Sequence, residues 1–144
     1  MAVTKTTYGT VTAVPGLTLN SVASAGTATS TAVNNTTDLA LDALVSVTVT
    51  TASGTLGSNP TVDIYALGSL DNTTYADVGN AAYLGSVVVT TAATAATKDN
   101  MSVAEAFGGS MPPYWKIYVV NNTGLGLGSS GNSANYVELT LTTA

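Results

Sequence analysis

The side chains best suited to chemistry in this sequence lie between residues 68 and 80, where Asp71, Asn72 and Asp77 occur close together. Carboxylate and amide oxygens are the ligands that a hard cation such as Ca²⁺ takes. Their spacing misses the EF-hand pattern, D-x-[DN]-x-[DN]-G followed later by a glutamate. The same residue types form Asx turns in surface loops. We therefore expect no metal site, and these three residues are the only candidates for one.

The reactive side chains elsewhere do not indicate an enzyme. Histidine and cysteine are absent, so the chain lacks the usual general base and the thiolate nucleophile. Eight Asp and Glu residues are present and could in principle cleave a glycosidic bond, but the sequence sets no pair apart. Lys116 lies between aromatic residues on the less apolar side of its segment, as a surface lysine does. We expect no enzymatic activity, no catalytic residues and no cofactor.

Aromatic side chains offer a second kind of chemistry, because their rings can stack on sugar rings. Seven residues could contribute to such a platform: Tyr65, Tyr75, Tyr83, Tyr114, Trp115, Tyr118 and Tyr136. Most of them fall in expected strands, where a place in the core or in an interface is the ordinary role. The sequence leaves both interpretations open.

The strongest structural signal is the segment 114–120, which follows two consecutive prolines. Proline disfavours a helix at this point, and the aromatic and β-branched residues after it favour a strand. Alternation places Trp115, Ile117 and Val119 on one face, and the turn residues of 121–124 end the strand. We predict a core strand here and assign these three residues to the interior.

Other segments alternate in the same way. The clearest is 44–51, whose Val45, Val47 and Val49 we expect in the core together with Val62 and Ile64. The further predicted strands are 62–67, 84–90, 101–107 and 134–141, with 90–100 as a low-complexity connection. The segment 101–107 is ambiguous, because 103–106 could also make one helical turn, but the glycines and prolines that follow it favour a strand.

The last predicted strand, 134–141, also has an apolar and a polar side. Val137, Leu139 and Leu141 form its apolar face, so Tyr136 and Glu138 are expected at the surface.

These segments predict an all-β fold. Seven or eight strands separated by turns, with no long helix, favour an antiparallel β-sandwich, and a jelly roll is one form of it. We assign the sandwich to residues 38–144. Residues 1–37 are mostly small, with strand-like stretches at 7–14 and 27–33, and we expect an extended N-terminal arm or edge strands. Because such residues bury little, the arm is expected to be ordered by contact with a neighbouring molecule. An unstructured terminus and an internal strand of the sandwich are the alternatives.

The composition favours a protein that stays in contact with neighbours. Only 8% of the residues are charged while 45% are hydrophobic, and so few surface charges promote self-association. The net charge of −5 lacks the basic surface that nucleic acids require. No apolar run approaches the roughly 18 residues of a membrane span. The N-terminus has no continuous apolar segment after Lys5, so we expect no secretory signal.

Two stretches resemble a known class of proteins: VDIYALGSLDNTTYAD at 62–77 and PPYWKIYVVNNTGLGLGSSGNSANYVEL at 112–139. Over residues 38–141 the chain is similar to small virion proteins of tailed bacteriophages. The resemblance implies a β-sandwich that decorates or cements the outer capsid surface, made in the host cytoplasm. Its implied partners are the major capsid protein and copies of itself, with a homotrimer by analogy. A tail or adaptor protein, and a carbohydrate-binding module for attachment to a host glycan, are the alternatives.

Overall fold

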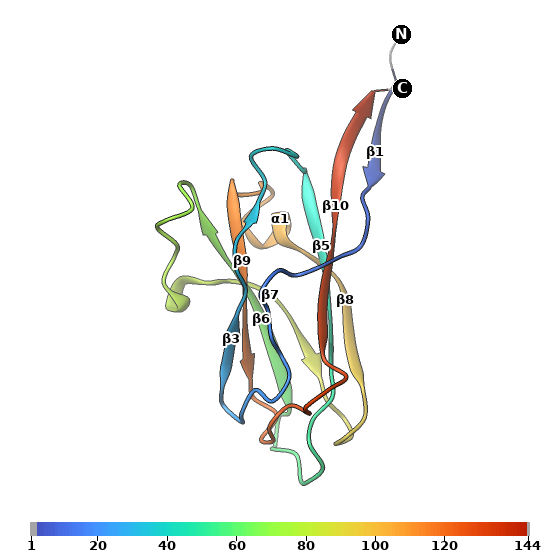
Figure 1. The fold of residues 1–144 in the computed structure, drawn as a ribbon, viewed down its shortest axis with the longest axis vertical. Helices are drawn as coiled ribbons and strands as arrows, with labels where there is room; N and C mark the ends of the chain where they lie inside the picture. The colour runs from blue at the N-terminus through green and yellow to red at the C-terminus, as the bar shows by residue number, and fades with distance from the viewer. Residues whose placement is uncertain (1–2, 144) are drawn as a thin grey trace.

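The computed structural model describes residues 3–143, which form two antiparallel β-sheets packed face to face (Figure 1). This is the all-β sandwich that the sequence predicts. The described residues contain ten strands rather than seven or eight, because the two strand-like stretches of the N-terminal segment are each broken into two short strands.

Each sheet contains five strands, and we name the sheets after a central strand. The β5 sheet has the order β1-β10-β5-β8, with β2 also beside β10: β1 (Thr4–Tyr8), β2 (Thr12–Ala13), β5 (Asp42–Val49), β8 (Ala96–Ser102) and β10 (Ser133–Thr143). The β9 sheet has the order β3-β9-β6-β7, with β4 also beside β9: β3 (Thr27–Thr29), β4 (Val33–Asn34), β6 (Thr61–Ser69), β7 (Ala82–Val88) and β9 (Tyr114–Asn121).

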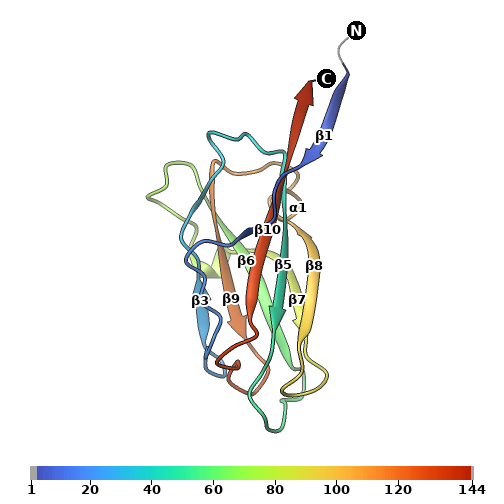
Figure 2. The same cartoon turned by 45° about the vertical axis from the view of Figure 1, so that its right-hand side comes forward.

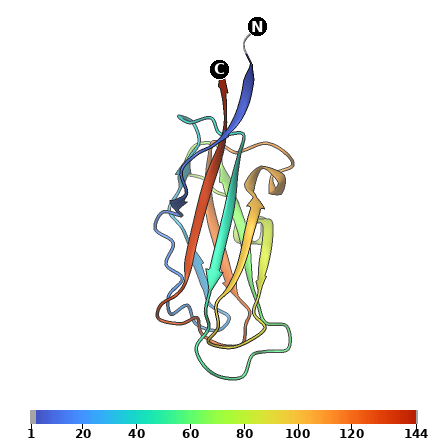
Figure 3. The same cartoon turned by 90° about the vertical axis from the view of Figure 1, so that its right-hand side faces the viewer.

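The connectivity is that of a jelly roll. When β1 with β2, and β3 with β4, are each counted as one interrupted strand, both sheets have four strands. Every connection then crosses from one sheet to the other except the one between β6 and β7. Two such interleaved sheets form the jelly-roll arrangement. Figure 3 views the molecule with the β5 sheet in front.

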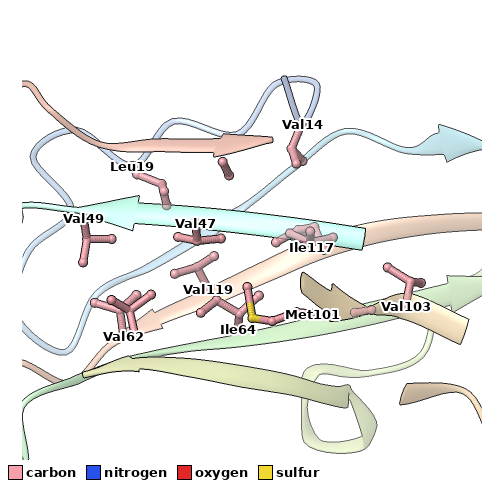
Figure 4. Packing of buried hydrophobic residues seen from close by; sticks show 14 of the residues in the cluster. Val14, Leu19, Val47, Val49, Val62, Ile64, Met101, Val103, Ile117 and Val119 are labelled. Carbon is pink, nitrogen blue, oxygen red and sulfur yellow. The ribbon is translucent and has the colours of Figure 1, made fainter. Parts of the chain in front are cut away.

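The core lies between the sheets and is built from alternate residues of β5, β6 and β9 (Figure 4). All eight residues that the sequence assigns to the core are fully buried: Val45, Val47, Val49, Val62, Ile64, Trp115, Ile117 and Val119. The period-2 pattern therefore identified the inward faces of these three strands correctly.

The chain between β7 and β9 differs from the prediction. The predicted strand 101–107 is wrong: β8 begins earlier, within the segment taken for a connection, and a short helix α1 (Val103–Ala106) follows it. The hydroxyl of Ser102 accepts a hydrogen bond from the Glu105 amide at 2.9 Å. The Asp42 carboxylate of β5 accepts the Ala104 amide at 2.9 Å. The helical turn at 103–106, the alternative to a strand in the sequence, is therefore what forms, and one of its two caps comes from a distant strand.

The faces of β10 are also reversed from the prediction. Tyr136 packs inward, with its ring edge-on to Trp115 at a centroid distance of 5.3 Å. Val137 pairs with Leu44 of β5 and lies on the outward side of the sheet. The reason is register, because Tyr136 is opposite the inward-facing Val45 and opposed residues share a face. The apolar side of this strand therefore faces away from the core.

Much of the N-terminal segment packs on its own chain. Val14, Leu19 and Val33 are buried in the core, and β3 and β4 both pair with β9. The expectation that a neighbouring subunit orders this part is therefore wrong. Strand β1 differs, because all five of its residues are exposed.

Replacing Trp115 with alanine should lower the free energy of unfolding by about 3–5 kcal/mol, as truncation of a large buried aromatic does. The indole is fully buried and contacts Tyr136. Urea denaturation followed by circular dichroism measures the change. Trp115→Phe is the matched variant: no group among residues 3–143 accepts the buried indole N–H, so it should cost less. An equal loss for both variants would contradict the packing described here.

Deletion of the N-terminal segment should act in two steps. Removing residues 1–10 takes away only exposed described residues and should leave a folded protein. Removing residues 1–25 also takes Val14 and Leu19 from the core, and losing such side chains costs roughly 2–5 kcal/mol for a large aliphatic residue. We expect the longer deletion to abolish cooperative thermal unfolding. If the proteins that lack residues 1–10 and 1–25 were both folded and similarly stable, the burial of Val14 and Leu19 would be contradicted.

Candidate functional site

Three tyrosines form a row across the outer face of the β9 sheet. Tyr65 of β6 is opposite Tyr83 of β7 on one side and Tyr118 of β9 on the other. The ring centroids of Tyr65 and Tyr83 are 5.5 Å apart with planes at 62°, and those of Tyr65 and Tyr118 are 6.1 Å apart at 45°. We call these residues the tyrosine row. The ring at its end, Tyr83, is 56% exposed.

A polar cluster borders the row. The two oxygens of the Asp63 carboxylate accept hydrogen bonds from the Ser86 hydroxyl and from the Asn122 side-chain amide, the latter at 2.7 Å. Tyr83 Oη lies 2.7 Å from Ser86 Oγ. Because the single Ser86 proton is donated to Asp63, Tyr83 must donate to Ser86. The cluster thus has a fixed direction of donation that ends on the carboxylate.

The environment of the central tyrosine disfavours its ionised form. Burial raises the pKa of the Tyr65 hydroxyl above its ordinary value of 10.0, and the negative charge of Asp63 raises it further, followed by Tyr83 and Tyr118. Tyr65 therefore remains a phenol that can donate a hydrogen bond at any physiological pH.

The structure places the three metal candidates in a tight loop. Asp71 accepts the amides of Thr74 and Thr73 at 2.7 and 2.9 Å, and these bonds hold the pKa of its carboxyl well below the usual range. Asn72 Oδ1 accepts the hydroxyl of Tyr75 at 2.6 Å. Asp71 and Asn72 therefore share one turn.

The third metal candidate lies apart from that turn. Asp77 precedes the 3-10 turn η1 (Val78–Asn80). Within residues 3–143, no three Asp or Glu residues come close enough to hold a metal ion.

The outer side of β10 carries an apolar stripe. Val137 is opposite Leu44, and two residues later Leu139 is opposite Tyr8 of β1. Leu141 continues the same side, because residues two apart in a strand share a face. Tyr8 and Leu141 are 64% and 54% exposed. We call these five residues the apolar stripe.

The stripe extends onto a projecting ribbon. Beyond Leu139, strand β10 no longer pairs with β5 and is joined only to β1, over the pairs from Thr7↔Thr140 to Thr4↔Thr143. Figures 1 and 2 show this two-stranded ribbon standing clear of the sandwich. Two strands alone are marginally stable in water. The ribbon also leaves strand edges open to pairing by another chain.

The inward side of β10 contains an acid near the end of the sandwich. Burial raises the pKa of Glu138, and the charge of Asp38 raises it further. The pKa of Tyr136 is raised first by burial and then by Glu138 and Asp38. Glu138 was expected at the surface, but it is half-buried beside a like charge.

The structure separates the seven aromatic candidates into two groups. Trp115 and Tyr136 pack in the core, while Tyr65, Tyr75, Tyr83, Tyr114 and Tyr118 lie on the outer side of the β9 sheet or in the loop beside it. In that loop, the Tyr75 ring lies 3.8 Å below the Lys116 ammonium. The sequence analysis missed Asp63, Ser86 and Asn122. Only Asp63 carried a signal, as it stands two residues before Tyr65 and so shares its face.

A scan against protein-family models finds no match for this chain, and a search of curated proteins finds no similar sequence. Across the described part of the chain, no helix is both long enough and apolar enough to span a membrane.

Replacing Glu138 with glutamine should raise the free energy of unfolding at about pH 7. A raised pKa means that the folded state favours the protonated acid, so the native protein loses stability as the pH rises from the ordinary value of 4.5 through the raised pKa. Glutamine does not titrate, and the gain should disappear below about pH 4. Urea denaturation at about pH 7 and below about pH 4 measures the free energy of unfolding of the variant and of the unmodified protein. Glu105→Gln, an exposed site with the same charge change, is the control. A gain independent of pH would contradict this explanation.

Proposed function

We propose that the protein is a non-enzymatic structural protein of a tailed-phage virion, bound to the outer face of the capsid shell as a decoration or cement protein. The observation that carries this proposal is the outward-facing apolar stripe together with the projecting ribbon. Tyr8 and Leu141 are exposed, and Leu44, Val137 and Leu139 are only partly covered, so a free monomer leaves apolar surface in water. A contiguous exposed apolar surface ordinarily marks an interaction site.

The ribbon provides a second means of attachment. Its backbone edges can accept a strand from a neighbouring chain, which adds main-chain hydrogen bonds to the burial of Tyr8 and Leu141. Its polar residues are mainly threonines, as at Thr7 and Thr142, whose hydroxyls lie 2.8 Å apart. Threonine suits a strand covered by a partner, and few charges would have to be desolvated.

The fold and the sequence resemblance support the same class of protein. Jelly rolls occur in viral capsid proteins, although a fold alone does not fix a function. The stretches 62–77 and 112–139 resemble phage virion proteins. On this proposal the partners are the major capsid protein and other copies of this chain, arranged as a trimer by analogy with closed symmetric oligomers.

Cryo-electron microscopy of purified virions tests the position. We expect density for the protein on the outer capsid surface, with the ribbon and the apolar stripe against the shell or a neighbouring copy. Density found only in the tail would favour the tail or adaptor alternative. Absence of the protein from purified virions would refute the proposal.

Charged substitutions in the apolar stripe should weaken particle binding. Leu141→Asp and Tyr8→Asp each place a carboxylate where an apolar side chain would be buried, and loss of that burial should reduce affinity about tenfold or more. Both residues are exposed in the single chain, so folding should persist. Co-sedimentation with particles that lack the protein measures binding. Leu70→Asp, at an 85% exposed leucine in the loop after β6, is the matched control. Equal binding by all variants would rule out this surface.

A further inference from the structure

We propose that the tyrosine row and the polar cluster beside it form a binding site for a neutral carbohydrate chain. The inference does not depend on the proposed virion role, because it concerns the opposite outer face of the sandwich. It rests on the exposure of Tyr83 and the spacing of the three rings, on the directed hydrogen bonds at Asp63, and on a polar hollow next to Tyr83.

The rings are suited to successive sugars of one chain. Adjacent centroids are 5.5 and 6.1 Å apart, a separation comparable to the length of one pyranose ring. The negative face of an aromatic ring attracts the slightly positive C–H groups of a sugar. The ring planes are tilted by 62° and 45° to one another, so the row is not flat. It therefore fits a single soluble chain better than a flat crystalline polysaccharide surface.

The polar cluster supplies groups for sugar hydroxyls. Each Asp63 oxygen accepts one bond from the protein, and an ionised carboxylate offers about four acceptor positions. The remaining positions can accept hydroxyl protons, and the Asn122 amide carries a second N–H that can donate. Because Ser86 and Asn122 already orient the carboxylate, binding would cost little reorganisation.

A polar hollow continues the site at the edge of the sandwich. It has a volume of about 480 Å³ between β7 and β8, and Tyr83 forms part of its wall. Lys98, Asn100 and Glu105 also line it, and all three side chains can hydrogen-bond to hydroxyl groups. A chain that stacks on the row could therefore extend past Tyr83 into this hollow.

Charge favours a neutral ligand. Asp63 lies at the centre of the cluster and the whole chain carries a net charge of −5, so an acidic sugar would be repelled. Lys116 has its ammonium over the Tyr75 ring, and Lys98 lines the hollow together with the acids Asp99 and Glu105. Neutral hexoses match the available groups, because they offer hydroxyls to Asp63 and apolar faces to the tyrosines.

Binding can be tested with the full-length protein and defined sugars. A panel of neutral hexasaccharides of glucose, mannose, galactose and xylose, with a hyaluronan hexasaccharide as the acidic comparison, is titrated by isothermal calorimetry. We expect at least one neutral hexasaccharide to bind and hyaluronan not to bind. No binding across the neutral panel, or a preference for hyaluronan, would overturn the proposal.

Three variants locate the site. Tyr83→Ala should reduce affinity about tenfold or more, whereas Tyr83→Phe, which keeps the stacking ring, should retain most of it. Tyr8→Ala is the matched control, since Tyr8 is similarly exposed but lies on the ribbon. Thermal unfolding verifies that each variant is folded. Equal loss in Tyr8→Ala and Tyr83→Ala would overturn the assignment.

Particle binding separates this proposal from the virion role. Tyr83→Ala should still co-sediment with particles, because the apolar stripe is unchanged. If Tyr83→Ala lost particle binding and the unmodified protein bound no sugar, the tyrosine row would be a contact between protein subunits and the carbohydrate site would be wrong.

Discussion

The fold depends on the apolar packing between the two sheets. The valines of β5 and the Trp115 side of β9 belong to one core cluster and have no exposed surface. The chain has no cysteine, so no disulfide supports this contact, and only 8% of its residues are charged. Each fully buried Val or Ile contributes roughly 1.5–3 kcal/mol. Hydrophobic burial between the two sheets is therefore the main source of stability.

A buried amide then fastens the N-terminal segment to this core. Asn121, at the end of β9, donates to the carbonyls of Val22, Ala23 and Leu125 at 3.2, 3.0 and 2.8 Å. Its oxygen accepts the hydroxyl of Thr123 at 2.7 Å. A fully satisfied polar group in the interior is specific, because any other arrangement leaves it without partners. This network explains how a segment of small residues takes a defined place in the sandwich.

The two outer faces of the sandwich have different chemistry. The β5 sheet presents the apolar stripe and the threonine-rich ribbon, whereas the β9 sheet presents tyrosines beside a hydrogen-bonded carboxylate. These two outer faces point in opposite directions because the sheets pack against each other through their inner faces. A protein attached to a particle through its β5 sheet would therefore leave its β9 sheet free to bind a ligand. A jelly roll suits this division, since its core uses only one face of each sheet.

The sequence by itself determined the fold class and the interior. Alternation in β5, β6 and β9 identified the core side chains because a strand with one buried face must place apolar residues at every second position. It could not determine which face of β10 packs on the core, because alternation separates two faces without saying which one is covered. The apolar face of this strand consists of Val137, Leu139 and Leu141. Pairing with β5 decided which face is covered. Tertiary structure also decided between a strand and a helical turn after Ser102, where Asp42 caps the helix, and brought Asp63, Ser86 and Asn122 together. These contacts join residues 23 to 62 positions apart, and local sequence carries no record of such partners.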